Sequence, residues 1–355
     1  MKKVKNLANE IFIEGLSGMA TGLFATLIIG TIIQQIGGFL PGTIGEMVFI
    51  IGKIAASVTG VGIGCGVAVR FKESPLVIMS AATCGMMGAF ASKILAGSVL
   101  VEGNIIYAGP GEPLGAFVAA LAGIYIGRLV SGKTKVDIII TPLLSIMAGS
   151  TVGLILGPPI SRFMGFLGEL INMGTQQQPF LMGILVSVIM GIILTLPISS
   201  AALGIILNLS GLAAGAATVG CCANMVGFAV ASYRENKMNG LLAQGLGTSM
   251  LQIGNIMKKP IIWFPAIISS AILGPLATLV FHMTNNATGS GMGTAGLVGQ
   301  ITTYQTMVSA GENVVSVLFK IILLHFVLPA ILSLGISEFM RKKGWIQDGD
   351  MTLSV

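Results

Sequence analysis

The chain has 355 residues, of which 54% are hydrophobic and only 9% are charged, and its formal net charge is +6. A soluble domain carries roughly a quarter charged residues, so this composition excludes a soluble globular enzyme. The Lys and Arg residues are scattered over short loops instead of gathered in one basic domain, which argues against a nucleic-acid partner. The apolar residues form runs of about 20, the length that crosses a lipid bilayer. The sequence therefore predicts an all-α polytopic membrane protein.

Nine apolar segments are long enough to be clear membrane spans. In chain order they cover 11–33, 47–69, 75–97, 114–130, 138–157, 180–197, 212–232, 261–283 and 313–335. The first follows a basic N-terminus and is too long for the core of a signal peptide, so it is predicted to be a retained span. A tenth segment, 241–257, is long enough but carries three amide side chains. It could cross, re-enter, or lie inside a helical bundle away from lipid.

Two topologies agree with the rule that Lys and Arg concentrate in cytoplasmic loops. If the tenth segment crosses, about ten helices span the membrane. The only Lys and Arg residues in outer loops are then Arg162, Arg234 and Lys237. In the alternative, 198–232 and the tenth segment are re-entrant elements, eight helices cross, and the loop 233–237 lies inside. The alternative agrees slightly better with the charge rule, but charge alone leaves both open. Both termini are predicted to be cytoplasmic.

Three short patterns recur in the same order and indicate a parallel internal repeat of residues 45–160 and 178–285. They are F-x-x-G with a further Gly (from Phe49 and Phe180), A-A-T-x-G (from Ala81 and Ala216) and K-x-x-I-I-x-x-P (from Lys135 and Lys258). Chance recurrence is the alternative, because the chain contains 50 glycines. Otherwise, residues 1–345 are predicted to form a single integral membrane domain, followed by a short cytoplasmic tail, 346–355.

Catalytic and metal-binding patterns are missing from the sequence. The histidines are His282 and His325, and there is no H-E-x-x-H, G-x-S-x-G or P-loop pattern. The four cysteines lie in apolar segments without C-x-x-C spacing, so they are expected to pack as small hydrophobic residues. We therefore expect no enzymatic activity, no cofactor and no metal site.

Ionisable groups inside predicted spans are functional candidates by default because their burial is costly. The candidates of this kind are Glu14, Lys320 and His325. Glu14 lies one turn into the first span near the basic N-terminus, where pairing with Lys residues at the inner surface is the simpler interpretation. Lys320 lies near the outer end of the last span and could extend its ammonium group to the interface. His325 lies deeper and is the strongest of the three candidates for a buried polar role.

Neutral polar residues form a second set of candidates. Within 241–257, Gln244, Thr248, Gln252 and Asn255 recur at spacings of four, four and three, which places them on one face of a helix. Such a stripe is costly in lipid, so it must face protein or water. It is either a polar contact between helices or the wall of a substrate path. Asn224, in the neighbouring Gly/Ala-rich span, could contribute to the same cavity.

The joint 284–311 is too long and too apolar for a plain loop. It contains a string of glycines between Gly289 and Gly299, together with Asn285, Asn286, Thr294 and Gln300. Backbone that bends tightly and exposes its amides is tolerated at membrane depth where it lines a cavity. The pattern therefore predicts a re-entrant element, with a mobile outer loop as the alternative.

Four strings between residues 240 and 305 resemble the EIIC-like membrane proteins, a group that includes the PfoR-type toxin regulators. They are QGLGTSMLQ (244–252), KKPIIWFP (258–265), AILGPLAT (271–278) and GSGMGTAGLVGQ (289–300). The resemblance implies kinship with the IIC subunits of the bacterial phosphotransferase system. Those subunits are homodimers of the bacterial cell (inner) membrane that move a sugar by an elevator-like displacement of one domain.

The chain also departs from that pattern. It has no room for a soluble IIB domain that would carry the phosphate, and the acidic signature of sugar-specific IIC proteins is not evident. Gly111-Glu112-Pro113 is similar to only a short part of that signature and falls in an expected outer loop. Phosphorylation by a domain of this chain is therefore not expected.

Two hypotheses for function follow. In the first, the chain is a permease for a small polar solute, a sugar or polyol, and a cytoplasmic phosphotransferase or regulatory partner acts with it. The solute would bind among Asn224, Gln244, Thr248, Gln252, Asn255, Asn285, Asn286, Thr294 and Gln300. In the second, the chain is a membrane sensor that binds a solute and signals to a cytoplasmic partner. Flux across a membrane would support the first, and binding without flux the second.

Overall fold

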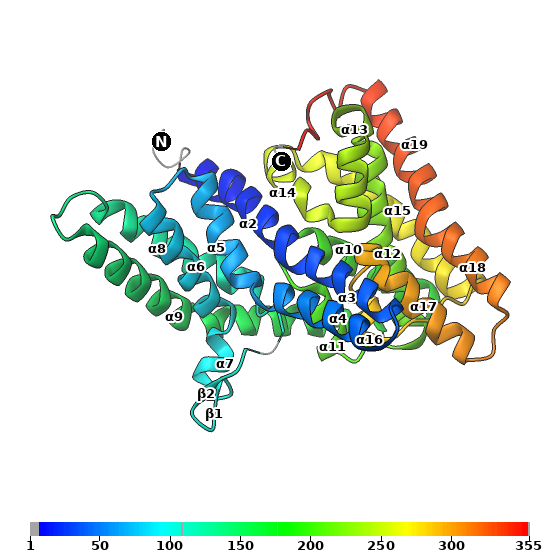
Figure 1. Cartoon of the computed structure of the whole chain (residues 1–355). Helices are drawn as coiled ribbons and strands as arrows, with labels where there is room; N and C mark the ends of the chain where they lie inside the picture. The colour runs from blue at the N-terminus through cyan, green and yellow to red at the C-terminus, as the bar shows by residue number, and fades with distance from the viewer. Residues whose placement is uncertain (1–6, 108, 176, 354–355) are drawn as a thin grey trace. The chain divides into compact units, whose positions relative to one another are not determined.

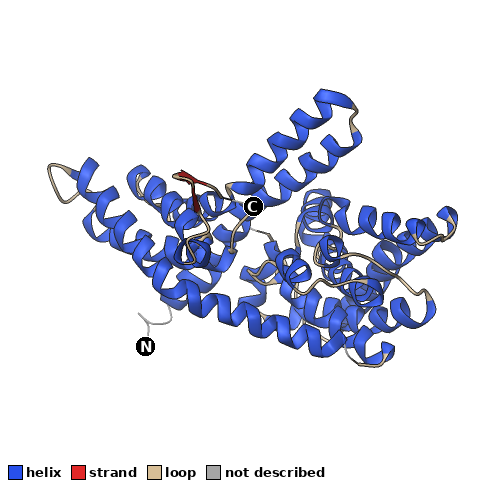
Figure 2. Cartoon of the chain, turned by 90° about the horizontal axis from the view of Figure 1, so that it is seen from below, coloured by secondary structure: helices blue, strands red, loops and turns tan. Residues whose placement is uncertain are grey.

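The computed structural model describes residues 7–107, 109–175 and 177–353, and its regular structure is almost entirely helical (Figures 1 and 2). In this part of the chain the strands are one short antiparallel pair, β1 (Leu100–Val101) and β2 (Asn104–Ile105). The chain divides into two compact units, unit 1 (Met1–Met164) and unit 2 (Gly165–Val355). It is an all-α polytopic membrane protein, as predicted.

Unit 1 is built from a long N-terminal helical run and the helices that follow it. Its elements are η1 (Glu10–Gly15), α2 (Leu16–Leu23), η2 (Phe24–Ile28), α3 (Ile29–Phe39), α4 (Gly42–Ser57), α5 (Thr59–Arg70), α6 (Pro75–Ala89), α7 (Ala91–Leu95), α8 (Pro113–Val130) and the first part of α9 (Asp137–Thr175). Here η denotes a π-helix or a 3-10 helix. Pro75 and Pro113 stand at the first helical positions of α6 and α8, where a missing N–H costs nothing.

Close packing in unit 1 depends on glycine. A Cβ atom on Gly64 of α5 would overlap the carbonyl oxygen of Ala81 on α6, and one on Gly85 would overlap that of Gly60. Lipid tails are as apolar as leucine, so helices in a membrane associate by close van der Waals contact, which small residues permit. The glycines of α5 and α6 therefore bring the two backbones together.

Ion pairs join the polar ends of the unit 1 helices. Glu14 of η1 accepts from Arg70 of α5 at 2.6 Å, and Arg128 of α8 pairs with Glu10 at 2.8 Å and with Glu73 at 2.5 Å. Glu14 thus has a basic partner, although that partner is Arg70 and not an N-terminal lysine.

Unit 2 surrounds one central helix. Its elements are α10 (Pro179–Thr195), α11 (Ser200–Ile206), α12 (Gly211–Ala231), α13 (Tyr233–Leu242), η3 (Ala243–Gly247), η4 (Ser249–Gln252), α14 (Ile253–Lys258), η5 (Pro260–Trp263), α15 (Phe264–Pro275), η6 (Leu276–Val280), α16 (Ala287–Ser290), η7 (Ala295–Leu297), α17 (Val298–Ser309), α18 (Val314–Ile322), η8 (Leu323–Val327) and α19 (Leu328–Lys342). The central helix is α12, which packs against α10, α15 and α19 (Figure 1) and is almost entirely buried.

The nine clear spans predicted from the sequence all coincide with helices in the described part of the chain. Six helical runs are long and apolar enough to cross a membrane, and α4 and α5 form a further pair with a bend of 53°. The remaining two predicted spans fall on the shorter apolar helices α6 and α10. Hydropathy therefore located the apolar helices correctly, and six of the predicted spans, or seven with the bent pair, have the length and hydropathy of a membrane span.

The tenth segment, 241–257, does not form one helix. The π-helix η3 ends at Thr248, whose backbone is extended (φ −161°, ψ 139°), and η4 and α14 follow. At the turn, the hydroxyl of Ser249 lies 2.7 Å from that of Thr195 in the interior of unit 2. Asn236, before the turn, and Asn255, after it, both donate hydrogen bonds to the C-terminal tail. The segment enters unit 2 and returns to the side it left. For residues 241–257 this geometry favours re-entry over crossing, and the prediction of one continuous helical face is wrong.

Two more segments turn inside unit 2. The chain passes from α10 through α11 and returns to Gly211, which forms an isolated antiparallel bridge with Asn285. The second is the glycine-rich segment, residues 284–300, which contains α16 and η7. The hydroxyl of Ser200 on α11 donates to the carbonyl of Gly291 at 2.6 Å, so the two segments are in contact. The predicted re-entrant element at this joint is therefore consistent with its buried, irregular backbone.

The two copies of the predicted repeat place their motifs on helix pairs that differ in orientation: one pair is antiparallel and the other is parallel. A short turn joins α5 to α6, so these helices run antiparallel. By contrast, Ser187 lies against Gly220 and Thr195 bonds Asn224, which makes α10 and α12 parallel. The internal repeat stays a prediction from the sequence.

Candidate functional site

Three groups of buried and half-buried polar side chains lie around α12 in unit 2. We call Gln244, Gln252 and Asn255 the amide chain. Asn224 forms a second centre by itself. The third group lies at the end of the glycine-rich segment, and we call Cys222, Gln300, Thr303 and His325 the histidine cluster. The predicted solute-binding residues are therefore distributed over separate places.

Asn224 is completely buried and fully hydrogen-bonded by protein. Its Nδ2 donates to the Gly220 carbonyl at 3.2 Å and to Ser270 Oγ at 3.1 Å. Its Oδ1 accepts from Thr195 Oγ1 at 3.3 Å and from Trp263 Nε1 at 2.9 Å. These bonds use the full capacity of a side-chain amide. Asn224 joins α10, α12, η5 and α15, and none of its amide atoms is left for a solute in this arrangement.

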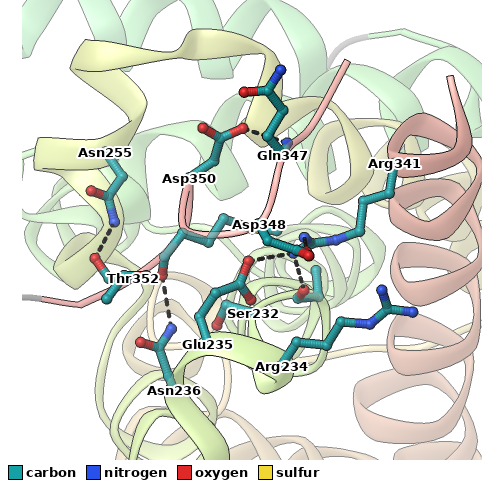
Figure 3. A network of polar contacts seen from close by, with 12 residues as sticks. Ser232, Arg234, Glu235, Asn236, Asn255, Arg341, Gln347, Asp348, Asp350 and Thr352 are labelled. Atoms are coloured by element: carbon teal, nitrogen blue, oxygen red, sulfur yellow. Dashed lines mark hydrogen bonds and ion pairs between the residues drawn. The ribbon is translucent and has the colours of Figure 1, made fainter. Parts of the chain in front are cut away.

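The amide chain points toward the end of the polypeptide. Gln252 donates from Nε2 to Gln244 Oε1 and to the Met351 carbonyl, each at 2.9 Å. Asn255 donates to Gln252 Oε1 at 2.8 Å and to the Thr352 carbonyl at 2.9 Å. Figure 3 shows Asn255 directed at Thr352. The amides form a chain that binds protein backbone in this structure.

Thr248 separates from the amide chain because the helix breaks there. Its hydroxyl accepts from the Met250 N–H at 3.2 Å and so caps η4. Threonine at an N-cap satisfies an otherwise unpaired backbone donor. The side chain is buried, and its role in this structure is local.

Asn285 and Asn286 hold the glycine-rich segment in place. Asn285 donates to Thr218 Oγ1 at 2.8 Å and to the Gly299 carbonyl at 3.2 Å. Asn286 caps α16 by accepting from the Gly289 N–H at 3.1 Å. Thr294 donates to the sulfur of Met225 at 3.4 Å. These contacts fix a backbone that has positive φ at Gly293, Gly296 and Leu297.

The histidine cluster is the most unusual part of the interior because several of its polar atoms have no protein partner. Gln300 Nε2 lies 3.1 Å from His325 Nδ1 and 3.3 Å from Cys222 Sγ. Among the described residues, no hydrogen-bond partner exists for Gln300 Oε1, His325 Nε2 or Thr303 Oγ1. Each such orphaned group costs about 1–3 kcal/mol when it stays unpaired. The cluster is therefore a candidate site for a polar molecule.

The free atoms define what the cluster can bind. With Gln300 Nε2 assigned as the donor to His325 Nδ1, a neutral ring would carry its hydrogen on Nε2, which is then a donor. Gln300 Oε1 is an acceptor, and the Thr303 hydroxyl is both. Thr303 follows Gln300 by one turn of α17, so the two side chains share a face. A donor, an acceptor and a hydroxyl suit a neutral polar molecule with several hydroxyl groups.

Ionisable groups outside the three polar groups form an ion pair, as Lys320 does, or cap a helix, as Glu112 does. Lys320 pairs with Glu312 at 2.6 Å, so its charge is compensated at that end of α18. Glu112 caps α8 by accepting from the Leu114 N–H at 3.5 Å. Burial raises the pKa of the Glu112 carboxyl to about 7, partly offset by that N–H. In the described residues no group of three or more His, Cys, Asp or Glu side chains could hold a metal ion.

Sequence reasoning missed several residues of these sites. Trp263 and Ser270 bind Asn224, and Cys222 and Thr303 belong to the histidine cluster. The spacing of three between Gln300 and Thr303 was a usable signal. The other contacts join residues far apart in the sequence, and no spacing rule could have found them.

Residues 13–353 match the family described as phosphotransferase system, EIIC. The chain belongs to this family. The resemblance drawn from residues 240–305 is thereby confirmed and extends over nearly the whole chain. Membership in the EIIC family makes the chain a multi-pass membrane component of sugar transport by the phosphotransferase system. A comparison with curated proteins finds no match.

The strings that carry the EIIC resemblance lie around the same central helix. QGLGTSMLQ forms η3 and η4, KKPIIWFP and AILGPLAT belong to η5, α15 and η6, and GSGMGTAGLVGQ is the glycine-rich segment. Elements from all four strings pack against α12. The four strings therefore contribute Gln244 and Gln252 to the amide chain, Gln300 to the histidine cluster, and Trp263, which binds Asn224.

Proposed function

We propose that this EIIC chain is a permease for a small uncharged solute with several hydroxyl groups, a sugar or a polyol, bound at the histidine cluster. The observation that carries the proposal is the set of unpartnered buried atoms on Gln300, Thr303 and His325. Buried polar groups are normally hydrogen-bonded, so a cluster of exceptions calls for a partner that is not protein. Solute hydroxyls would supply the missing donors and acceptors.

The charge of the surroundings supports a neutral solute. No member of the histidine cluster carries a fixed charge. The nearest ionisable residue earlier in the same helical run, Lys320, is paired with Glu312. An anion bound here would lose its hydration without gaining a countercharge, which is costly at low dielectric. The absence of a charged partner within the cluster thus favours hydroxyl groups over carboxylate or phosphate.

An elevator-type movement is part of the proposal, with unit 2 as the moving body. Three segments turn inside unit 2, and the glycine-rich one contacts another of them through Ser200 and Gly291. Irregular backbone at membrane depth is tolerated where it lines a path for a solute. The glycines give that backbone the conformations that a changing site requires.

The proposal includes the setting of the protein. We place it in the bacterial cell (inner) membrane, as a homodimer, with both termini cytoplasmic and no catalytic activity of its own. One end of unit 2 holds Arg234, Lys259 and Arg341 close to the tail, which fits the cytoplasmic side. Any phosphate would come from a cytoplasmic phosphotransferase partner.

The first experiment is a thermal-stability screen in detergent against sugars, polyols, sugar phosphates, nucleosides and organic acids. A ligand at 100 times its dissociation constant adds about 2.7 kcal/mol to the free energy of unfolding. We expect stabilisation by a sugar or polyol. Stabilisation by anions alone would contradict a neutral solute.

A matched pair of variants locates the site. Gln300→Leu should weaken binding of the stabilising sugar or polyol at least about fivefold, since a lost hydrogen bond at a buried site is worth about 1 kcal/mol or more. Gln305→Leu changes the same residue type on α17 at an exposed position and should bind normally. Equal affinities for the two variants would exclude the histidine cluster as the site.

Flux separates the permease from the second candidate, a sensor. The observation that favours a sensor is the tail, which the amide chain holds through Met351 and Thr352 and which a partner could read. Accumulation or exchange of the stabilising solute in proteoliposomes supports the permease. Binding without flux supports the sensor.

A further inference from the structure

Residues 346–353, which we call the tail, fold back onto unit 2 (Figure 3). Met351 is 0% exposed and Ile346 is 2% exposed. Both belong to a hydrophobic cluster with Phe228, Ile262 and Met340. The tail therefore inserts two apolar side chains into the folded unit.

The backbone of the tail is bound by three side-chain amides. Asn236 Nδ2 donates to the Met351 carbonyl and Asn236 Oδ1 accepts from the Leu353 N–H, each at 2.8 Å. Gln252 also donates to the Met351 carbonyl, and Asn255 donates to that of Thr352. Asn236 thus donates to one backbone group of the tail and accepts from another, as the backbone of a neighbouring β-strand does when it binds an extended peptide. These residues form a built peptide site.

Charge adds selectivity to this site. Asp350 pairs with Lys259 at 2.6 Å, and both side chains are largely shielded from solvent. Asp348 pairs with Arg341 at 3.0 Å, but its own side chain is 85% exposed. An exposed pair contributes little, so Asp350 is expected to matter more than Asp348.

The peptide site is connected to the histidine cluster. Gln252 binds Gln244 of η3, and Gln244 donates to Ser232 Oγ at 2.8 Å. The element η3 packs against η7, which ends three residues before Gln300. A change in the tail therefore acts on an element that touches the glycine-rich segment.

We propose that the tail is a latch: a peptide bound within its own chain whose docking holds η3 against the glycine-rich segment and slows access to the histidine cluster. Release of the tail leaves the donors of Gln252 and Asn255 without their backbone acceptors, so η3 and α14 rearrange. Docking and opening of the cluster are linked, and linkage is reciprocal. The effect on solute exchange rests on the proposed function, whereas the peptide site does not.

The peptide site is tested by removing the tail and adding it back. A variant that lacks residues 348–355 should bind a fluorescent peptide of residues 346–355 saturably, and the full chain should bind it much more weakly because the site is occupied. In the peptide, D350N should weaken binding severalfold and D348N should leave it nearly unchanged. No binding to the truncated variant above a scrambled peptide, or equal binding to the full chain, would overturn the proposal.

The latch is tested without any solute through the native cysteines. Cys222 lies beside Gln300 and Cys84 lies in unit 1, and both are 0% exposed. In a Cys221→Ala background, truncation should raise the labelling rate of Cys222 by a small thiol reagent severalfold, with no change at Cys84. Added peptide should restore the slow rate, which a damaged fold would not permit. An unchanged rate at Cys222 would refute the latch.

Solute exchange then distinguishes the latch from the proposed function. In proteoliposomes the truncated variant should exchange the stabilising sugar or polyol severalfold faster than the full chain, and added peptide should reverse this. If Cys222 labelling responds but no solute is bound or moved by either form, the proposed permease fails and the latch stands. If solute moves equally fast with and without the tail, control of exchange by the latch is refuted.

Discussion

The two units differ most in the chemistry of their interiors. In the described part of unit 1, the buried polar side chains are the small hydroxyls of Thr59, Ser80, Thr141 and Ser145. The described part of unit 2 buries amides, a histidine and many more hydroxyls. Both units contain close glycine contacts between helices. Close packing is therefore common to both, and polar interiors belong to unit 2.

This difference indicates a division of labour. Small residues allow helices to pack in lipid without any polar interaction, which suffices for a rigid support. A buried amide or imidazole is costly unless it is paired, so its presence calls for a structural partner or a ligand. In unit 2, Asn224 and the amide chain have structural partners, and the histidine cluster leaves atoms unpaired. The comparison predicts different mutational responses in the two units.

The largest effect is expected at Asn224. Asn224→Leu leaves the Trp263 N–H without its partner and removes one bond each from the hydroxyls of Thr195 and Ser270, which keep others. The free energy of unfolding should fall by about 3 kcal/mol or more, because the orphaned N–H costs about 1–3 kcal/mol and each other lost bond adds about 1 kcal/mol. Thermal unfolding in detergent measures the loss, with the exposed Asn239→Leu as the control. Similar midpoints for the two variants would show that the Asn224 bonds carry no stability.

In unit 1 the largest loss of stability should come from a substitution that only adds volume between two helices. Gly64→Ala places a methyl group against the carbonyl of Ala81 and forces α5 and α6 apart. We expect a loss of about 2–3 kcal/mol, as for overpacking of a core. Gly38→Ala, where no atom lies within 4 Å of the added carbon, is the control and should be neutral or slightly stabilising. An unaffected Gly64→Ala would contradict backbone-to-backbone packing in this unit.

A third variant asks whether the amide chain is structural. Gln252→Leu leaves Gln244 Oε1 without its partner and removes one bond each from Asn255 and the Met351 carbonyl, which keep their other partners. Stability should fall by about 2 kcal/mol, while the contacts proposed between solute and histidine cluster remain. The measurement is the unfolding midpoint together with solute affinity. Loss of affinity with unchanged stability and unchanged Cys222 labelling would instead place the amide chain in the solute site.

The smallest effect concerns pH and unit 1. The pKa of Glu112 is raised from 4.5 to about 7, so the folded state prefers the protonated carboxyl. Its contribution to stability is full below pH 4.5 and is lost as pH rises to about 7. Partial solvent contact of this half-buried side chain limits the loss to about 1 kcal/mol. Glu112→Gln should flatten this part of the stability–pH curve, and an unchanged slope would contradict the raised pKa.

Features that depend on local composition were predictable. The nine apolar runs became helices because a membrane span must satisfy its backbone internally, and only regular structure does so. The string of glycines at 289–299 correctly indicated buried, irregular backbone. His325 and Gln300 were both selected as candidates, since polar groups in apolar runs are unusual wherever they lie.

Features that depend on distant contacts were not predictable. The regular spacing of Gln244, Thr248, Gln252 and Asn255 suggested one helical face, but the backbone breaks at Thr248. The tail supplies acceptors for this chain from about 100 positions away, as the Gln252–Met351 bond shows. The pairing of Gln300 with His325 likewise requires two helices to meet. No local pattern contains that information.

The sequence by itself determined the membrane class, the positions of the apolar helices and the EIIC kinship, because hydropathy and long motifs are properties of contiguous residues. Only the tertiary structure decided which buried amides bind protein and which atoms stay unpaired. A hydrogen bond acts over about 3 Å, so its existence depends on which helices pack together. Asn224 and Gln300 look equivalent in the sequence, but packing pairs every amide atom of Asn224 and leaves Oε1 of Gln300 unpaired.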